Sequence, residues 1–233
     1  MRSLLYVFAR APEAGRVKTR LIPRVGAAGA AALARAFLDD TLVLTRGVAD
    51  RRVLAIAGDV NEPSILRLAE REGIDRVQQA EGDLGARMAK AILDGARAAS
   101  HGGELGRVAI VGCDAPLLEA RQITHAVNLL DDAHLVLGPA EDGGYWLIGA
   151  RACPLVEEHL AAILSDTMWS STGVRATTLE RARARGLVVA LGEPAFDVDE
   201  PADLDRLARA LDDGPSRAPA TRAALSLVLR SAP

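Results

Sequence analysis

The cationic side chains of this sequence gather in a short segment directly behind its first apolar run. Leu4–Phe8 is apolar enough to form a buried strand, and the residues that follow it include Pro12, Gly15 and four cations. The cations are Arg10, Arg16, Lys18 and Arg20. Because ligands of α/β proteins bind beyond the carboxyl ends of the strands, this segment predicts an anion cradle, and phosphate is the anion we expect. The alternative is a solvated basic loop.

The basic segment does not match the known nucleotide-binding fingerprints. Two residues separate Gly15 from Lys18, whereas a P-loop places a glycine directly before its lysine. The sequence has neither the G-x-G-x-x-G of dinucleotide-binding proteins nor the G-x-S-x-G nucleophile elbow. Short motifs of this kind therefore do not assign the ligand.

An aspartate follows another apolar run at the same predicted edge of the sheet. Val108–Val111 leads into Gly112, Asp114 and Pro116. A carboxylate that faces a cationic loop suits a divalent ion bound to a nucleotide diphosphate, because Mg²⁺ is held by a few carboxylates together with phosphate oxygens. The alternative is that Asp114 only caps a helix that begins near Pro116.

Two further acidic segments carry candidate catalytic and metal-binding groups. Asp142 precedes the diglycine Gly143-Gly144, where the backbone can approach a ligand and Asp142 can orient a hydroxyl group or act as a base. The other segment contains Asp197 and Asp199, either of which could complete the metal site. The alternatives are an ordinary acidic turn and an ordinary helix start.

Two more segments are candidate walls of a ligand pocket. Gly82 and Gly85 permit close approach to a base or ribose, and Arg87 could contact a phosphate or an acidic partner. An ordinary helix start capped by Asp83 explains the same residues. The polar segment around Trp169 either lines an acceptor pocket or caps the next helix.

Hydrophobic periodicity predicts a single α/β domain with a mainly parallel sheet and helices on both faces. The expected strands are 4–8, 53–57, 75–78, 108–111, 135–138, 145–149 and 187–190, and the clearest helices are 27–46, 83–99 and 117–130. The fifth and sixth strands are too close for a helical crossover, so they either pair antiparallel or the chain bends sharply. We expect the domain to span residues 1–211, followed by an appendage at 212–233 that folds back or is partly mobile.

Composition limits the compartment and the partners. With 233 residues and 49% hydrophobic content, the chain can bury one full core. The net charge of −3 argues against nucleic acid as a partner. Cys113 and Cys153 are too few for a disulfide framework and lack zinc-site spacing, which fits a reducing cytoplasm. We expect no membrane span, because no run approaches about 18 apolar residues.

The order of these motifs resembles the DUF2064 family of small bacterial proteins and the glycosyltransferases of the arsenosugar-biosynthesis type. Both belong to the nucleotide-diphospho-sugar transferase (GT-A) superfamily, and the resemblance covers residues 4–207. It implies a Rossmann-like GT-A fold, a divalent metal, Mg²⁺ or Mn²⁺, and a nucleotide over the first strand. The segments that carry it are 8–12 with 15–21, 82–85, 112–116, 138–145 and 197–204.

The resemblance also implies roles for individual residues. Nucleotide and phosphate contacts fall on Ala9, Arg10, Gly15, Lys18, Arg20, Gly82 and Gly85. Asp114 becomes a catalytic residue and, with Asp199, a metal ligand, while catalytic Asp142 forms the sugar or acceptor loop with Gly143 and Gly144.

The reaction that the resemblance implies is glycosyl transfer from a nucleotide sugar to a small-molecule acceptor. Pro116 stands where many such enzymes carry the second aspartate of Asp-x-Asp, as it does in related nucleotidyltransferases. The alternative is therefore a guanylyltransferase-like enzyme that uses a nucleoside triphosphate and releases pyrophosphate. A regulatory nucleotide-binding module is a third, non-enzymatic alternative.

Overall fold

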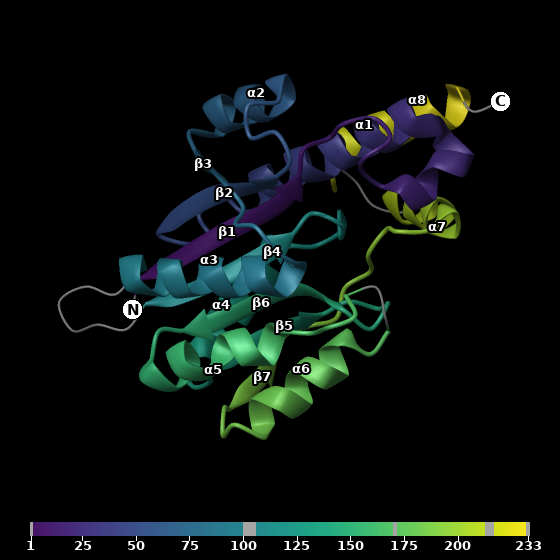
Figure 1. Cartoon of the computed structure of the whole chain (residues 1–233). Coiled ribbons are helices and arrows are strands. Elements are labelled where there is room, and N and C mark those ends of the chain that lie inside the picture. Colours follow the sequence, from purple (N-terminus) through teal and green to yellow (C-terminus); the bar gives the residue numbers. More distant parts are fainter. Residues whose placement is uncertain (1, 100–105, 170–171, 213–216, 232–233) are drawn as a thin grey trace.

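The computed structural model describes residues 2–99, 106–169, 172–212 and 217–231, and its centre is one seven-stranded sheet (Figure 1). The strand order is β3-β2-β1-β4-β6-β5-β7, and only β6 runs antiparallel to its neighbours. The strands are β1 Ser3–Arg10, β2 Arg51–Ala57, β3 Asp75–Gln78, β4 Arg107–Gly112, β5 Leu135–Pro139, β6 Tyr145–Arg151 and β7 Val189–Leu191. This sheet confirms the predicted α/β class.

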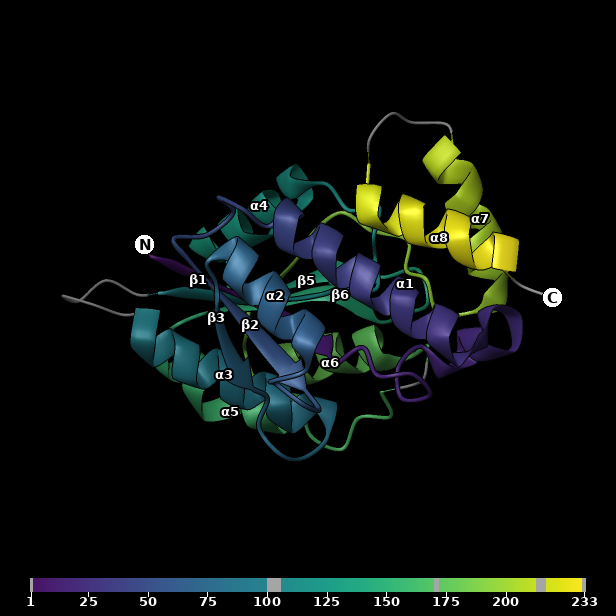
Figure 2. The same cartoon turned by 90° about the horizontal axis from the view of Figure 1, so that it is seen from above.

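Helices cover both faces of the sheet (Figure 2). Alternating side chains of β1 point to opposite faces, so Leu5 joins the core beneath α1, α2, α4, α7 and α8, and Leu4 joins the core beneath α3, α5 and α6. The helices are α1 Ile22–Leu44, α2 Pro63–Glu72, α3 Leu84–Ala99, α4 Ala120–Asn128, α5 Pro154–Leu164, α6 Val174–Arg183, α7 Pro201–Asp212 and α8 Pro219–Ser231. Short 3₁₀ turns precede α1 at Thr19–Leu21 and follow α4 at Leu129–Asp131.

The closely spaced strands β5 and β6 form an antiparallel hairpin. Pro139 pairs with Tyr145, so the acidic diglycine segment becomes the hairpin turn. Strand β6 then lies between β4 and β5. This pairing places the turn at the edge of the sheet where the parallel strands end.

The residues at 19–44 form a long, apolar helical segment. By length and composition alone, this one segment passes the test for a membrane-crossing helix, which differs from our expectation of no such run. Its geometry is that of a core helix, because Gly26 interrupts it with φ 68° and its side chains Leu33, Phe37 and Leu42 are fully buried against the sheet.

Helix α8 lies alongside α1 and places Leu225 and Val228 in the same core (Figure 2). Asp40 of α1 is buried, and its carboxylate accepts hydrogen bonds from the backbone N–H groups of Ala220 (3.0 Å) and Thr221 (2.7 Å). These first-turn donors would otherwise lack partners, so Asp40 stabilises the start of α8. Residues 213–216, at the start of the expected appendage, lie outside the described residues.

Candidate functional site

A cavity of about 700 Å³, here called the edge cavity, opens where β1, β2 and β4 end. The β5–β6 turn and the segment before α7 complete its wall. Eight of the residues to which the family resemblance assigns roles line it. They are Ala9, Arg10, Lys18, Arg20, Asp114, Asp142, Gly144 and Asp199. Segments far apart in the sequence therefore meet at one edge of the sheet.

Three aspartates in the edge cavity form what we call the acidic group: Asp142, Asp197 and Asp199. One carboxylate oxygen of each lies within 4.8 Å of the others. The chain from 192 to 199 continues past β7 along β5, where Ala195 N–H donates to Pro139 O at 2.9 Å. This backbone pairing brings Asp197 and Asp199 to Asp142, whose Oδ1 accepts the Gly144 N–H at 2.7 Å.

The acidic group has the electrostatics of a cation site. Burial, followed by the negative charge of Asp142, raises the pKa of Asp197 to about 6. Like charges at this spacing disfavour full ionisation unless a cation neutralises them. Carboxylate oxygens are the ligands that Mg²⁺ and Mn²⁺ prefer, so the donor set fits such a metal.

The ammonium of Lys18 is held by protein acceptors rather than free to bind a ligand. The ammonium of Lys18 contacts Asp114 Oδ1 at 2.5 Å, and it donates to Asp199 Oδ1 and Val198 O, each at 2.7 Å. Its side chain is only 7% exposed, and three acceptors take up its three donors. Burial alone lowers the pKa of Lys18, but Asp114 and Asp199 outweigh burial and raise it. This geometry disfavours direct phosphate contact by Lys18.

Asp114 lies outside the acidic group and does not cap the next helix. Helix α4 begins at Ala120 rather than near Pro116, and Glu119 forms a capping box with Gln122. The carbonyl of Asp114 instead accepts the Val198 N–H at 2.8 Å, which ties β4 to the acidic group. Metal ligation by Asp114 stays a prediction.

Four of the predicted glycines do not line the edge cavity, namely Gly15, Gly82, Gly85 and Gly143. A Cβ on Gly85 would lie 2.0 Å from Leu164 O, and one on Gly143 would lie 2.0 Å from Thr172 O. Both glycines therefore serve close packing of backbone segments. Gly15 and Gly82 have φ of +81° and +104° and occupy turns.

Sequence reasoning did not select Gln79 and did not commit to Arg87, although both line the edge cavity. Gln79 is buried directly after β3, and its amide donates to Ala9 O at 3.1 Å and to Ala55 O at 3.0 Å. The signal available in the sequence was an amide side chain directly after the strand expected at 75–78. Asp83 accepts the Ala86 N–H at 2.8 Å, so it does cap α3.

The aromatic side chains and the cysteine in the cavity wall pack against other protein groups. Tyr145 and Trp169 pack edge to face with ring centroids 6.3 Å apart. Burial raises the pKa of the Cys113 thiol to about 12, and its Sγ contacts Phe8 O at 3.4 Å. Cys113 is therefore unsuited to act as a thiolate nucleophile.

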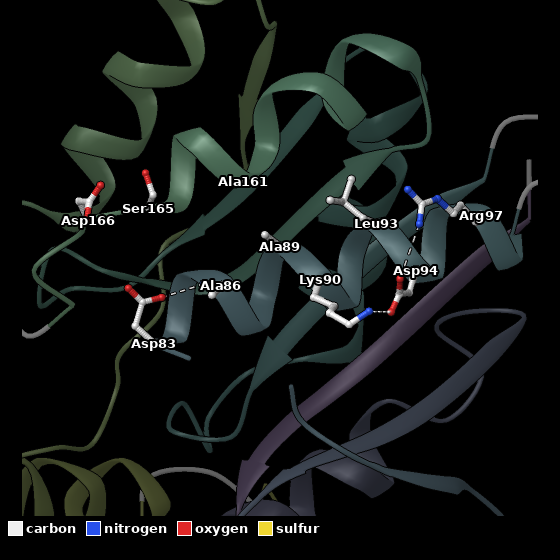
Figure 3. A pocket seen from close by; sticks show the side chains of 10 residues that line it. All are labelled: Asp83, Ala86, Ala89, Lys90, Leu93, Asp94, Arg97, Ala161, Ser165 and Asp166. Carbon is white, nitrogen blue, oxygen red and sulfur yellow. Dashed lines mark hydrogen bonds and ion pairs between the residues drawn. The ribbon is translucent and has the colours of Figure 1, made fainter. Parts of the chain in front are cut away.

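A second hollow of about 650 Å³, here called the helix groove, lies between α3 and α5 (Figure 3). Ala89, Leu93 and Ala161 form part of its lining, and charged residues surround them. Three of these charged residues pair with one another: Lys90 with Asp94 at 2.8 Å, and Arg97 with Asp94 at 3.9 Å. None of the aspartates of the acidic group lines the helix groove.

Comparison with known proteins identifies both a similar solved structure and the family of this chain. The fold is that of a predicted nucleotide-diphospho-sugar transferase from Desulfovibrio desulfuricans G20, which is 28% identical with a TM-score of 0.84 over 99% of this chain and 98% of that one. The model of DUF2064, uncharacterized proteins conserved in bacteria, matches residues 41–171. The chain therefore belongs to the DUF2064 family.

More distant structures share the fold. Rv0371c from Mycobacterium tuberculosis H37Rv, solved in complex with manganese, is 17% identical with a TM-score of 0.53 over 91% of this chain and all of that one. The 2-C-methyl-D-erythritol 4-phosphate cytidylyltransferase of Thermus thermophilus is 20% identical with a TM-score of 0.52 over 92% of this chain and all of that one. No curated protein matches the chain.

Proposed function

We propose that this protein is a divalent-metal-dependent transferase that uses a nucleotide-activated donor. The observation that carries the proposal is the acidic group, three converging aspartates in a cavity that also holds the arginines of the first loop. The similar proteins named for nucleotide-diphospho-sugar or cytidylyl transfer support the donor class, and the manganese complex of Rv0371c supports the metal. A cavity of about 700 Å³ is large enough for a nucleotide-sized ligand.

Different residues of the cavity would have different roles in such a reaction. Asp142, Asp197 and Asp199 would hold Mg²⁺ or Mn²⁺, which when bound neutralises charge that develops on phosphate oxygens. Lys18 keeps Asp114 and Asp199 in place, and the acceptor hydroxyl would be oriented by a carboxylate of the β5–β6 turn.

Between the two reaction classes, we propose glycosyl transfer from a nucleotide sugar to a small acceptor. Asp-x-Asp is missing at 114–116 but present at 197–199, where buried Val198 separates two aspartates that both line the cavity. In glycosyl transfer the sugar C1–O bond breaks and a nucleoside diphosphate leaves. The second candidate is nucleotidyl transfer, which Pro116 and the likeness to the cytidylyltransferase fold favour.

The leaving group distinguishes the two reactions. The protein is incubated with Mn²⁺, a panel of nucleotide sugars or nucleoside triphosphates, and a mixture of small hydroxylated acceptors, and the products are resolved by mass. We expect a nucleoside diphosphate from a nucleotide sugar and none from the Asp197→Asn/Asp199→Asn variant. Stoichiometric pyrophosphate from a triphosphate, with no diphosphate from any nucleotide sugar, would establish nucleotidyl transfer instead. If the protein turns over neither the nucleotide sugars nor the nucleoside triphosphates, the transferase proposal is contradicted.

A further inference from the structure

Two arginines of the edge cavity make no salt bridge within the part of the chain that the structure describes. Arg10 ends β1, and Arg87 lies in the first turn of α3; both line the cavity. The other two cavity arginines are neutralised, because Arg16 pairs with Glu13 and Arg20 with Glu200, each at 3.2 Å. Arg10 and Arg87 thus present their full charge to the cavity.

The backbone of the sheet holds Arg87 in this place through Gln79. Arg87 donates from Nη1 to Gln79 Oε1 at 2.9 Å and from Nε to Asp83 O at 3.2 Å. The amide nitrogen of Gln79 in turn donates to Ala9 O, the carbonyl that precedes Arg10. One buried side chain therefore joins Arg87 to the end of β1.

This arrangement places the exposed guanidinium of Arg10 near the partly buried guanidinium of Arg87. Burial first, and then the positive charge of Arg10, lower the pKa of Arg87, while Asp83 partly opposes them. Repulsion between cations costs free energy in the empty protein, and a bound anion would offset that cost. The Nη2 atom of Arg87 makes no hydrogen bond to the described residues and can donate to such an anion.

We propose that Arg10 and Arg87 form an oxyanion subsite that binds a phosphate group without a metal. A guanidinium matches phosphate oxygens with paired N–H donors, whereas the acidic group of the same cavity repels a phosphate unless a cation is present. The strand order separates the two, since the arginines follow β1 and β3 and the acidic group follows β5 and β7. The subsite does not depend on the transferase proposal, because it requires neither turnover nor metal.

Calorimetry in EDTA with inorganic pyrophosphate and inorganic phosphate as probes tests this subsite. We expect the parent protein to bind pyrophosphate with an affinity that falls as ionic strength rises, because salt screens exposed charges. Arg10→Gln and Arg87→Gln should each weaken binding by about tenfold or more, the effect of losing a charged hydrogen bond. Arg87→Lys keeps the charge but not the paired donors, and it should lie between Arg87→Gln and the parent.

Arg97→Gln is the matched control, because Arg97 lies on the same helix but faces the helix groove (Figure 3). It should leave the pyrophosphate affinity unchanged, and thermal unfolding should show that all variants fold. Nucleosides and nucleoside monophosphates identify the source of the phosphate. Loss of monophosphate binding in Arg87→Gln with nucleoside binding retained would place the nucleotide's own phosphate at the subsite, whereas loss of only inorganic phosphate binding would indicate a free anion.

Three results would overturn the inference. They are the absence of pyrophosphate binding by the parent in EDTA, parental affinity in both glutamine variants, and an equal loss of nucleoside and pyrophosphate binding. The last result would assign the arginines to the nucleobase. A positive result combined with no metal-dependent turnover would leave the subsite intact and reject only the transferase proposal.

Discussion

The edge cavity and the helix groove are similar in volume, about 700 and 650 Å³, yet their charges are arranged differently. In the helix groove, cations and anions pair locally along exposed helix surfaces, as Lys90 does with Asp94 (Figure 3). In the edge cavity, three aspartates converge on one side, and on the other lie two arginines that form no salt bridge with any described residue. The two regions therefore differ in the arrangement of their charges and not in their volume.

The difference follows from the elements that build each region. An exposed helix places residues four apart side by side, so opposite charges meet and neutralise within one segment. The edge cavity is built from ends of strands that are distant in sequence, and charge partners such as Lys18 and Asp199 come from different segments. Uncompensated charge is costly in a partly buried site, so its persistence there points to a ligand.

The largest expected effect comes from removing one charge of the acidic group. Asp142→Asn should lower metal-dependent turnover by about 10²–10⁴, the usual contribution of a positioned acid or base. Steady-state kinetics would measure the turnover. Asp94→Asn, an acid of the helix groove, is the control and should keep parental turnover. Equal losses in the two variants would remove the distinction between the regions.

Lys18 should matter mainly for stability and for the position of the two carboxylates. Lys18→Met removes a buried cation from three acceptors and leaves Asp114 and Asp199 adjacent and uncompensated. Both carboxylates are partly exposed, so solvent screens their repulsion, and we expect the free energy of unfolding to fall by about 1–3 kcal/mol. Urea denaturation would measure it. A variant as stable as the parent, with weaker diphosphate binding, would restore Lys18 as a phosphate contact.

The pH dependence of the metal-free protein tests the crowding of carboxylates. Because the pKa of Asp197 is raised to about 6 in the folded state, the folded protein binds this proton more tightly than the unfolded chain does. The contribution of Asp197 to the free energy of unfolding should therefore be largest below its unfolded pKa of about 4. It should decrease as the pH rises towards 6. Asp197→Asn should flatten that slope in urea denaturation curves. An unchanged slope would show that another group causes it.

Most of the sheet could be predicted from the sequence because most of its strands contain a continuous apolar run, β3 being the polar exception. The strand at 75–78 was predicted with its observed bounds, and the other six differed by one to a few residues. Helices α2 and α5 were not among the clear predictions. Helix α1 begins before Gly26, five residues earlier than expected, because Pro23 suits the first turn of a helix. The boundary between a domain at 1–211 and an appendage stays a prediction.

The candidate site was only partly predictable, for a physical reason. Strand ends indicated Arg10, Asp114 and Asp142 because position beside a buried run is visible in sequence. The convergence of Asp197 with Asp142 depends on the path of 192–199 along β5, which no local pattern reveals. A ligand contact at Gly85 stays a prediction, because a glycine that packs against a neighbouring helix looks the same in sequence as one that contacts a ligand.

The smallest expected effect is that of the helix groove itself. Lys90 and Asp94 are both exposed and four residues apart on α3, the spacing of a solvent-screened helical pair. Lys90→Met should change the free energy of unfolding by less than about 0.5 kcal/mol and leave turnover within about twofold of the parent. Urea denaturation and steady-state kinetics would measure these quantities. Because α3 also carries Arg87 at the edge cavity, a large loss of turnover in Lys90→Met would mean that the helix couples the two regions, and the contrast between them would then fail.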